Sequence, residues 1–171
     1  MDVQEAIRCR RSVREYQPRA VEEEKLARLI EAARLAPSAR NLQEWKFVIV
    51  RRRETRLKLA ALAAQPFIGT APVVIAACAV ETKLVMRCGQ LAYPIDVAIA
   101  LDHLALAAVE EGLGSCWIGA FDEEKVKALL GVPAEVRIVE LLTLGYPEEP
   151  LKPRRKSRKP LDEIVVREKW E

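Results

Sequence analysis

Histidine, asparagine and aromatic residues are scarce in this sequence of 171 residues. It contains one histidine, His103, one asparagine, Asn41, and 5% aromatic residues. A metal site built from several histidines is therefore excluded, and a triad of serine, histidine and aspartate could use only His103. We interpret His103 as a residue of the core or of a subunit interface.

Cysteine pairs and long apolar segments are also missing. The cysteines form no CxxC pair and lie mostly within apolar or helical patterns, which favours reduced, buried thiols over disulfides or metal ligands (Cys9, Cys78, Cys88 and Cys116). The N-terminus is charged from Asp2 onward and lacks the apolar stretch of a signal peptide. The longest apolar run, Val97 to Val109, is shorter than the roughly 20 residues of a membrane helix. We therefore expect a cytoplasmic protein without a membrane segment.

The glycine loops that bind nucleotide phosphates are absent as well. Neither GxGxxG after a strand nor GxxxxGK[ST] occurs, so a Rossmann site or a P-loop has no support. Half of the residues are apolar and 31% are charged, which predicts one folded domain that buries roughly 70% of its surface. The net charge of +3 is too small to identify a partner.

Apolar periodicity predicts helices that alternate with strands. Helices are expected over 2–12, from Glu22 to Pro37, and over 54–64, 93–111 and 122–131, and strands over 45–50, 71–80, 115–121 and 137–146. This order indicates a layered α/β or α+β fold. The helix over 93–111 is apolar almost all round, which suggests a subunit interface. Residues after Pro147 are poor in core residues and predict an extended tail.

Four segments carry groups that could bind a ligand, and each has a simpler explanation. Arg10, Arg11, Ser12 and Arg14 suit a phosphate, or merely neutralise a helix C-terminus. The loop APSARNLQEW from Ala36 offers hydroxyl and amide groups, or is a turn set by Pro37. In the third segment, GLGSCWIGAF from Gly112, the glycine at Gly119 allows close approach of a ligand or marks a strand bulge. The fourth segment is the basic run Lys152–Lys159, which is either a solvated run or a nucleic-acid contact.

Taken together in chain order, these segments resemble one family. RRSVREY, APSARNLQEWKFVIV, GLGSCWIGAFD, LGYP and KSRKPLDEIV, spread from Ile7 to Val165, are similar to the nitroreductase family of FMN-dependent oxidoreductases. The resemblance implies an α+β sandwich with a central, mainly antiparallel sheet flanked by helices. It also implies a homodimer with FMN at the subunit interface. Residues 1–150 would form a single FMN-binding domain, and residues 151–171 an extension that reaches across the dimer.

The resemblance also assigns cofactor-binding residues, position by position. Arg10, Arg11, Ser12 and Arg14 match the segment that holds the FMN phosphate and ribityl chain, with Arg14 at the N1 and O2 edge of the ring. Lys156, Ser157 and Arg158 match the tail residues that complete the phosphate site. Pro37, Ser38 and Asn41 match the loop that the partner subunit contributes to the site. Gly119 and Ala120 match the turn whose backbone N–H faces flavin N5. Gln65 is a polar candidate for a contact with the ring.

The activity implied is electron transfer from NAD(P)H through the flavin to nitroaromatic, quinone or similar acceptors by a ping-pong mechanism. No protein nucleophile and no metal are required. A flavin-dependent dehalogenase or a flavin-processing enzyme of the same fold stays open, as does the choice between NADH and NADPH. A basic nucleic-acid-binding module that uses Lys152–Lys159 is an alternative of another class, although aromatic residues do not interleave with its cations.

Two departures from the family pattern concern the surroundings of the site. The family loop often reads NxQPW, whereas this chain has NLQEW, and Glu44 in place of proline predicts a less rigid loop. The stretch from Val80 to Gly89 is too short for the helical insertion that covers the site in longer members. An open pocket is therefore expected.

Overall fold

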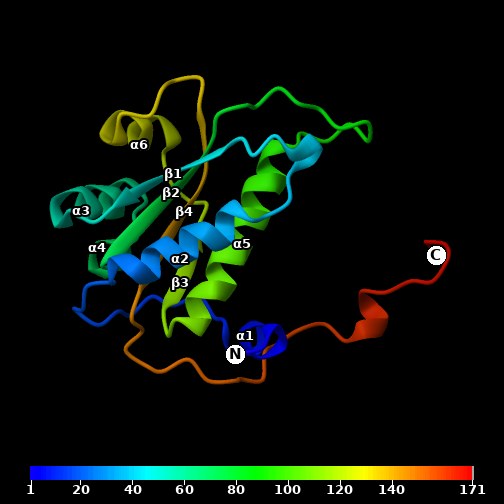
Figure 1. Cartoon of the computed structure of the whole chain (residues 1–171), viewed down its shortest axis with the longest axis horizontal. Coiled ribbons are helices and arrows are strands. Elements are labelled where there is room, and N and C mark those ends of the chain that lie inside the picture. The colour runs from blue at the N-terminus through cyan, green and yellow to red at the C-terminus, as the bar shows by residue number, and fades with distance from the viewer. Residues whose placement is uncertain (171) are drawn as a thin grey trace.

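The computed structural model describes residues 1–170 and shows one antiparallel sheet of four strands with helices on both faces (Figure 1). The strand order is β1-β2-β4-β3, with β1 at Trp45–Val50, β2 at Val73–Ala79, β3 at Gly114–Ile118 and β4 at Arg137–Gly145. The helices are α1 (Val3–Cys9), α2 (Glu23–Arg34), α3 (Arg53–Leu62), α4 (Phe67–Thr70), α5 (Tyr93–Glu110) and α6 (Glu123–Leu130), with short 3-10 turns η1 (Ala39–Asn41) and η2 (Leu161–Glu163). The predicted α+β sandwich is confirmed.

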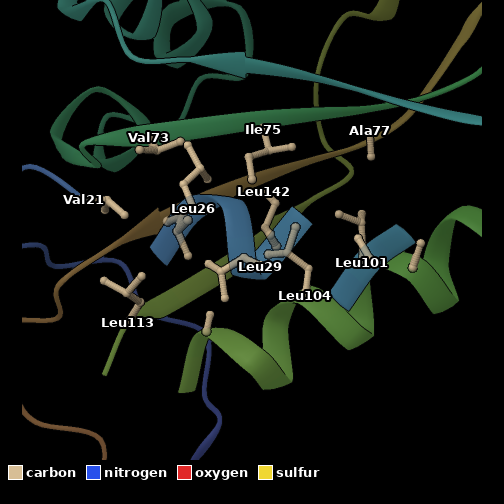
Figure 2. Packing of buried hydrophobic residues seen from close by; sticks show 14 of the residues in the cluster. Val21, Leu26, Leu29, Val73, Ile75, Ala77, Leu101, Leu104, Leu113 and Leu142 are labelled. Atoms are coloured by element: carbon tan, nitrogen blue, oxygen red, sulfur yellow. The ribbon is translucent and has the colours of Figure 1, made fainter. Parts of the chain in front are cut away.

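The sheet divides the interior into two apolar layers, because successive residues of a strand point to opposite faces. On one face, Val73, Ile75 and Leu142 pack against α2 and α5 (Figure 2). On the other face, residues such as Val74 and Leu141 pack against α3, α4 and α6. Strand β2 is buried along its whole length, as its unbroken apolar sequence predicts for a central strand.

Most helix boundaries follow from capping residues in the sequence. The Asp2 side chain accepts a hydrogen bond from the backbone N–H of Glu5 at 2.7 Å and starts α1. Asp122 caps α6 in the same way, and Gly131 ends it in the left-handed conformation. Helix α1 is shorter than predicted and ends at Cys9, because Ser12 instead pairs with Ser115 of β3. The short α4 was not predicted.

Helix α5 is the longest element and is buried along one side only. Leu101 and Leu104 belong to the core, whereas Ile95 on the opposite side is 40% exposed. A cavity of about 570 Å³ along that side includes His103 and Trp117. The helix therefore presents an apolar face that the described part of this chain leaves uncovered.

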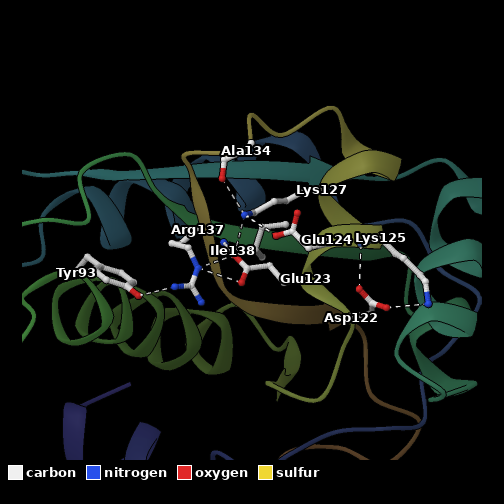
Figure 3. Close-up of polar contacts among 9 residues, drawn as sticks. All are labelled: Tyr93, Asp122, Glu123, Glu124, Lys125, Lys127, Ala134, Arg137 and Ile138. Atoms are coloured by element: carbon white, nitrogen blue, oxygen red, sulfur yellow. Dashed lines mark hydrogen bonds and ion pairs between the residues drawn. The ribbon is translucent and has the colours of Figure 1, made fainter.

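An ion cluster fastens α6 to β4 on the far side of the sheet from α2 (Figure 3). The Glu123 carboxylate accepts hydrogen bonds from Arg137 Nε at 2.9 Å and from the backbone N–H of Ile138 at 2.8 Å. The side chain of Lys127 is buried, and its ammonium lies 3.5 Å from the Glu123 carboxylate and donates a hydrogen bond to the carbonyl of Ala134. Arg137 also donates to the hydroxyl of Tyr93, which links the cluster to α5.

The C-terminal segment leaves the body of the protein. From residue 152 onward it passes α1 and extends away from the sheet and its helices (Figure 1). Its large apolar side chains are exposed, Leu161 by 74% and Trp170 by 90%. Of the extension predicted at 151–171, residue 171 lies outside the described residues. Within residues 1–170, no helix combines the length and apolarity that crossing a membrane requires.

Candidate functional site

The segment Arg10–Arg14 is held against strand β3 by backbone contacts. Ser12 forms an isolated parallel bridge with Ser115, and the N–H of Val13 donates to the carbonyl of Ser115 at 2.9 Å. A Cβ atom on Gly114 would lie 2.4 Å from a methyl carbon of Val13, so the close approach of the two segments requires glycine there. The sheet therefore fixes the position of the cationic segment.

A cavity of about 210 Å³ opens beside this segment. It is lined by Arg11, Ser12, Arg14, Glu15 and Glu149. Arg11 donates from Nη2 to the carbonyl of Glu149 at 3.0 Å, whereas its buried Nε has no hydrogen-bond partner among residues 1–170. A buried donor without a partner is unfavourable, so a ligand acceptor in the cavity would stabilise this arrangement.

Arg14 lines the same cavity and also reaches α4. Its guanidinium lies over the ring of Phe67, 5.8 Å from the centroid, which is a cation–π contact. Gln65 is half-buried just before α4. The thiol of Cys116 is buried close to Ser12 and Arg14, and its pKa is raised by burial. Phe67 and Cys116 could not be identified from the sequence, since single apolar residues in apolar elements are ordinary core residues.

The C-terminal cations reach the same end of the molecule. Lys156 donates from Nζ to the carbonyl of Ile7 in α1, and its pKa is lowered by burial and then by the positive charges of Arg10 and Arg158. Within residues 1–170, none of these three cations forms an ion pair with a carboxylate. Ser157 is exposed, and its carbonyl accepts a hydrogen bond from Arg158 at 2.6 Å. Cations from opposite ends of the chain thus accumulate around α1 without neutralisation.

Two acidic residues, Glu15 and Glu149, line this cavity, and sequence reasoning missed the role of Glu149. Its carboxylate lies 2.5 Å from Arg154 and 3.7 Å from Arg11, and these cations lower its pKa. Arg154 is therefore partly neutralised within the basic run Lys152–Lys159. Because the Glu149 carboxylate lies in the cavity next to Arg11, this position is favourable for a negatively charged group.

Gly119 and Ala120 follow the end of β3 and are exposed. Beside them lies Glu140 of β4, so that a Cβ on Gly119 would be 3.4 Å from its Oε2. Burial raises the pKa of Glu140. This carboxyl next to the glycine turn had no signal in the sequence, because the register of β4 against β3 places it there.

The predicted loop residues Pro37, Ser38 and Asn41 lie apart from the arginine segment of the same chain. The N–H of Ala39 donates to Asp96 near the start of α5 at 2.8 Å, whereas α1 packs on Val109 near the end of α5. These two positions are separated by about 20 Å along the helix axis. The described chain therefore does not bring the loop to Arg10–Arg14.

Beneath this loop two carboxyl groups are buried together. Glu44 and Asp96 are each 4% exposed, and neither oxygen of Glu44 accepts a hydrogen bond from an N–H group of the residues that the structure describes. The pKa of Glu44 is raised by burial and further by the adjacent Asp96. The sequence singled out Glu44 only as a replacement for proline. Its neighbour Asp96 could be identified only from the fold.

The cysteine thiols are free and mostly buried, as the sequence predicts. Cys9, Cys78 and Cys116 are buried, Cys88 is exposed, and all four are free. Residues 1–170 contain no group of three or more histidine, cysteine or acidic residues placed to hold a metal.

Comparison with known proteins identifies the family. The model of the nitroreductase family matches residues 7–68 and 59–146. The chain is 36% identical to a putative NADH dehydrogenase/NAD(P)H nitroreductase of Archaeoglobus fulgidus over 153 residues, which cover 84% of each protein. It is also 36% identical to a 5,6-dimethylbenzimidazole synthase of Rhodospirillum rubrum over 82% of this chain and 79% of that protein.

A solved structure agrees with these matches. The NADPH:FMN oxidoreductase of Vibrio harveyi, complexed with NAD⁺, superimposes with a TM-score of 0.88 at 25% identity and covers 99% of this chain and 78% of its own. The matched residues include the arginine segment, the loop before β1 and the turn after β3. The chain belongs to the nitroreductase family.

Proposed function

We propose that this protein is an FMN-dependent oxidoreductase that takes electrons from NAD(P)H and passes them to nitroaromatic, quinone or similar acceptors. Family membership and the NADPH:FMN oxidoreductase relative support the enzyme class, the cofactor and the donor. The observation that carries the proposal is the contact of Lys156 with α1 close to Arg10, the residue that precedes Arg11 of the cavity lining.

The cavity lining and the cations beside α1 together fit the phosphate group of FMN. The buried Nε of Arg11 lacks an acceptor, and the cations Arg10, Lys156 and Arg158 lack carboxylate partners within residues 1–170. A phosphate monoester supplies acceptor oxygens and negative charge together, and forked guanidinium donors match it bidentately. Ser12 adds a neutral donor, and we assign Ser157 to the same group.

The remaining predicted residues would hold and orient the flavin ring. Bound FMN would supply two-electron chemistry that side chains lack. We assign Arg14 to the edge of the ring that becomes negative on reduction, where a fixed guanidinium stabilises charge. The backbone of Gly119 and Ala120 would donate to the ring from the end of β3, and Gln65 would contact its polar edge. The chain provides binding and electrostatics, and no side chain acts as nucleophile.

We also propose a homodimer with the flavin at the interface, in which the segment 151–171 passes α1 of its own subunit at Lys156 and then reaches across to the partner. Pro37, Ser38 and Asn41 lie about 20 Å along α5 from the arginine segment, so a second copy must supply them if they contact the same flavin. The uncovered apolar face of α5 and the exposed apolar residues of the tail support this arrangement. Residues 1–150 would then form one folded domain whose flavin site is completed by its partner.

The site would serve donor and acceptor in turn, in a ping-pong cycle. Residues 80–92, which connect β2 to α5, contain no helix that could cover it, only an isolated bridge between Val85 and Leu91. An open site admits planar acceptors of different size, and this supports a broad acceptor range.

Anaerobic reduction of the bound flavin tests the proposal. Purified protein is expected to be yellow, to release FMN on denaturation and to lose its absorption near 450 nm when NADH or NADPH is added without oxygen. Addition of a quinone or nitroaromatic compound should restore the absorption. A colourless protein that takes up no added FMN, or a flavin that neither nucleotide reduces, would contradict it. Sedimentation of the flavin-loaded protein should give the mass of a dimer.

A second candidate is a flavin-processing activity. It is favoured by the 36% identity with a 5,6-dimethylbenzimidazole synthase over most of the chain. Incubation of the protein with reduced FMN and oxygen, followed by chromatography, would show 5,6-dimethylbenzimidazole if this activity is present. If no 5,6-dimethylbenzimidazole is formed and quinones are reduced rapidly, the function is that of a reductase.

A further inference from the structure

A second cavity lies apart from the candidate flavin site. It has a volume of about 660 Å³ and opens between residues 16–21, the start of α3 and the end of α4. It shares no lining residue with the cavity at Arg11 and Ser12. Its volume falls within the range of about 300 to 1,000 Å³ found for small-molecule sites.

The charged lining of this cavity is entirely cationic. It contains Arg19, Arg51, Arg53 and Arg56 and no aspartate or glutamate. Arg19 and Arg51 are paired with Glu22 and Glu23 at the start of α2. Within residues 1–170, Arg53 and Arg56 have no carboxylate within ion-pair distance. Two positive charges therefore face the cavity without compensation.

Arg56 is held rigidly by backbone carbonyls. Its Nε donates to the carbonyl of Arg51 at 3.2 Å, and its Nη1 donates to the carbonyls of Gly69 at 3.0 Å and of Ala71. Burial and then the charge of Arg53 lower the pKa of Arg56, as expected for a cation that lacks an anionic partner. These carbonyls fix the orientation of the guanidinium but leave its charge unneutralised. A preorganised guanidinium of this kind suits an oxyanion.

The rest of the lining is largely apolar. Val21, Leu57 and the prolines Pro18, Pro66 and Pro72 form the walls. An inorganic anion would leave these walls in contact with water, whereas an anion on an apolar body would cover them. The combination of a cationic end and apolar walls selects an amphipathic ligand.

We propose that this cavity binds a small organic oxyanion, with its phosphate or carboxylate group on Arg53 and Arg56 and its apolar body against Leu57 and the prolines. The site lies between segments that also carry predicted flavin contacts, since Tyr16 comes two residues after Arg14 and Pro66 directly follows Gln65. The proposal does not depend on the flavin function.

Calorimetric titration with phenyl phosphate tests the site. The protein is titrated as purified, and again after loading with FMN and removal of free flavin, so that the phosphate cavity at Arg11 is filled in the second series. Saturable binding with one ligand per chain is expected in both. Benzoate in a parallel titration distinguishes a carboxylate from a phosphate head group, and the tighter of the two ligands identifies the group.

Two charge reversals provide the matched comparison. Arg53→Glu should weaken binding by about tenfold or more, because it replaces a charge-assisted contact with repulsion. Arg52→Glu changes the net charge equally, but Arg52 does not line the cavity, and we expect less than about a twofold change. Both positions are exposed at the start of α3, where glutamate is favourable, so both variants should fold.

Three results would overturn the proposal. Absence of saturable binding of either ligand would remove the site. An equal loss in Arg53→Glu and Arg52→Glu would show general attraction to a basic surface. Inorganic phosphate that binds as tightly as phenyl phosphate would show that the apolar walls contribute nothing.

Discussion

Lys156 donates a hydrogen bond to the main-chain carbonyl of Ile7, which joins the C-terminal segment to helix α1 across 149 positions of sequence. The contact brings Lys156 next to Arg10 and Arg158, whose charges help to lower its pKa after burial. Like charges repel, so the arrangement is unfavourable without an anion. The proposed FMN phosphate would supply that anion.

Removal of these tail cations should therefore weaken flavin binding. We expect the double variant Lys156→Ala and Arg158→Ala to bind FMN at least about tenfold more weakly, since contacts to charged groups contribute about 1.5–3 kcal/mol each. Quenching of flavin fluorescence measures the affinity. Lys152→Ala, in the same basic run, serves as the control and should change it less than about twofold. Equal losses in both would indicate that the run acts only through its total charge.

Glu149 should oppose the binding of FMN. Its carboxylate lies 3.7 Å from Arg11 and lines the same cavity, so an incoming phosphate must compete with it. We expect Glu149→Gln to strengthen FMN binding about two- to fivefold, consistent with about 0.2–1 kcal/mol for an exposed ion pair. Glu148→Gln removes the same charge from a residue outside the cavity and is the control. Weaker binding by Glu149→Gln would instead show that Glu149 positions Arg11 for the flavin.

Local sequence signals were sufficient for most of the fold. Capping by Asp2 and Asp122, the stop at Gly131 and the apolar run of β2 place their elements within a few residues of the observed ends. The short α4 was missed because a helix of four residues has no periodicity to detect. The end of α1 was placed too late because its boundary depends on the distant Ser115, which pairs with Ser12.

The candidate site shows the same division between local and distant information. Arginines clustered within a few residues were visible in the sequence, and the family resemblance connected them to Lys156 and Arg158. Glu140, Glu149 and Asp96 were not found, because each reaches its place through strand register or the path of a loop. A single exposed acidic residue in a chain that is 31% charged carries no signal by itself.

Gly114 should be intolerant of a side chain, because its neighbour Val13 leaves no room. The Cβ of alanine would lie 2.4 Å from Cγ2 and 2.9 Å from Cβ of Val13. We expect Gly114→Ala to lower the free energy of unfolding by about 1–3 kcal/mol and to weaken FMN binding, because the arginine segment must move away from β3. Thermal unfolding and flavin titration measure the two effects. An unchanged melting temperature would contradict this close packing.

The carboxyl pair Glu44 and Asp96 should give stability a distinct dependence on pH. Burial and the adjacent Asp96 raise the pKa of Glu44 in the folded protein above its ordinary value of 4.5. The folded state therefore binds the proton of the Glu44 carboxyl more tightly than the unfolded state does. The contribution of Glu44 to the free energy of unfolding falls as the pH rises from about 4.5 through the pKa of the folded state, and it does not recover at higher pH.

Glu44→Gln should remove this fall, because glutamine is neutral and its amide can donate to the carboxylate of Asp96. We expect the variant to be more stable than the native protein at pH 8 by about 1–3 kcal/mol, the range for an unsatisfied buried polar group, and to differ little from it at pH 4. Chemical denaturation at a series of pH values measures the difference. Glu81→Gln is the matched control, because Glu81 is an exposed acid whose charge also raises the pKa of Glu44, and it should flatten the profile far less. A variant Glu44→Gln whose stability parallels that of the native protein from pH 4 to 8 would show that Glu44 carries no extra proton in the folded state.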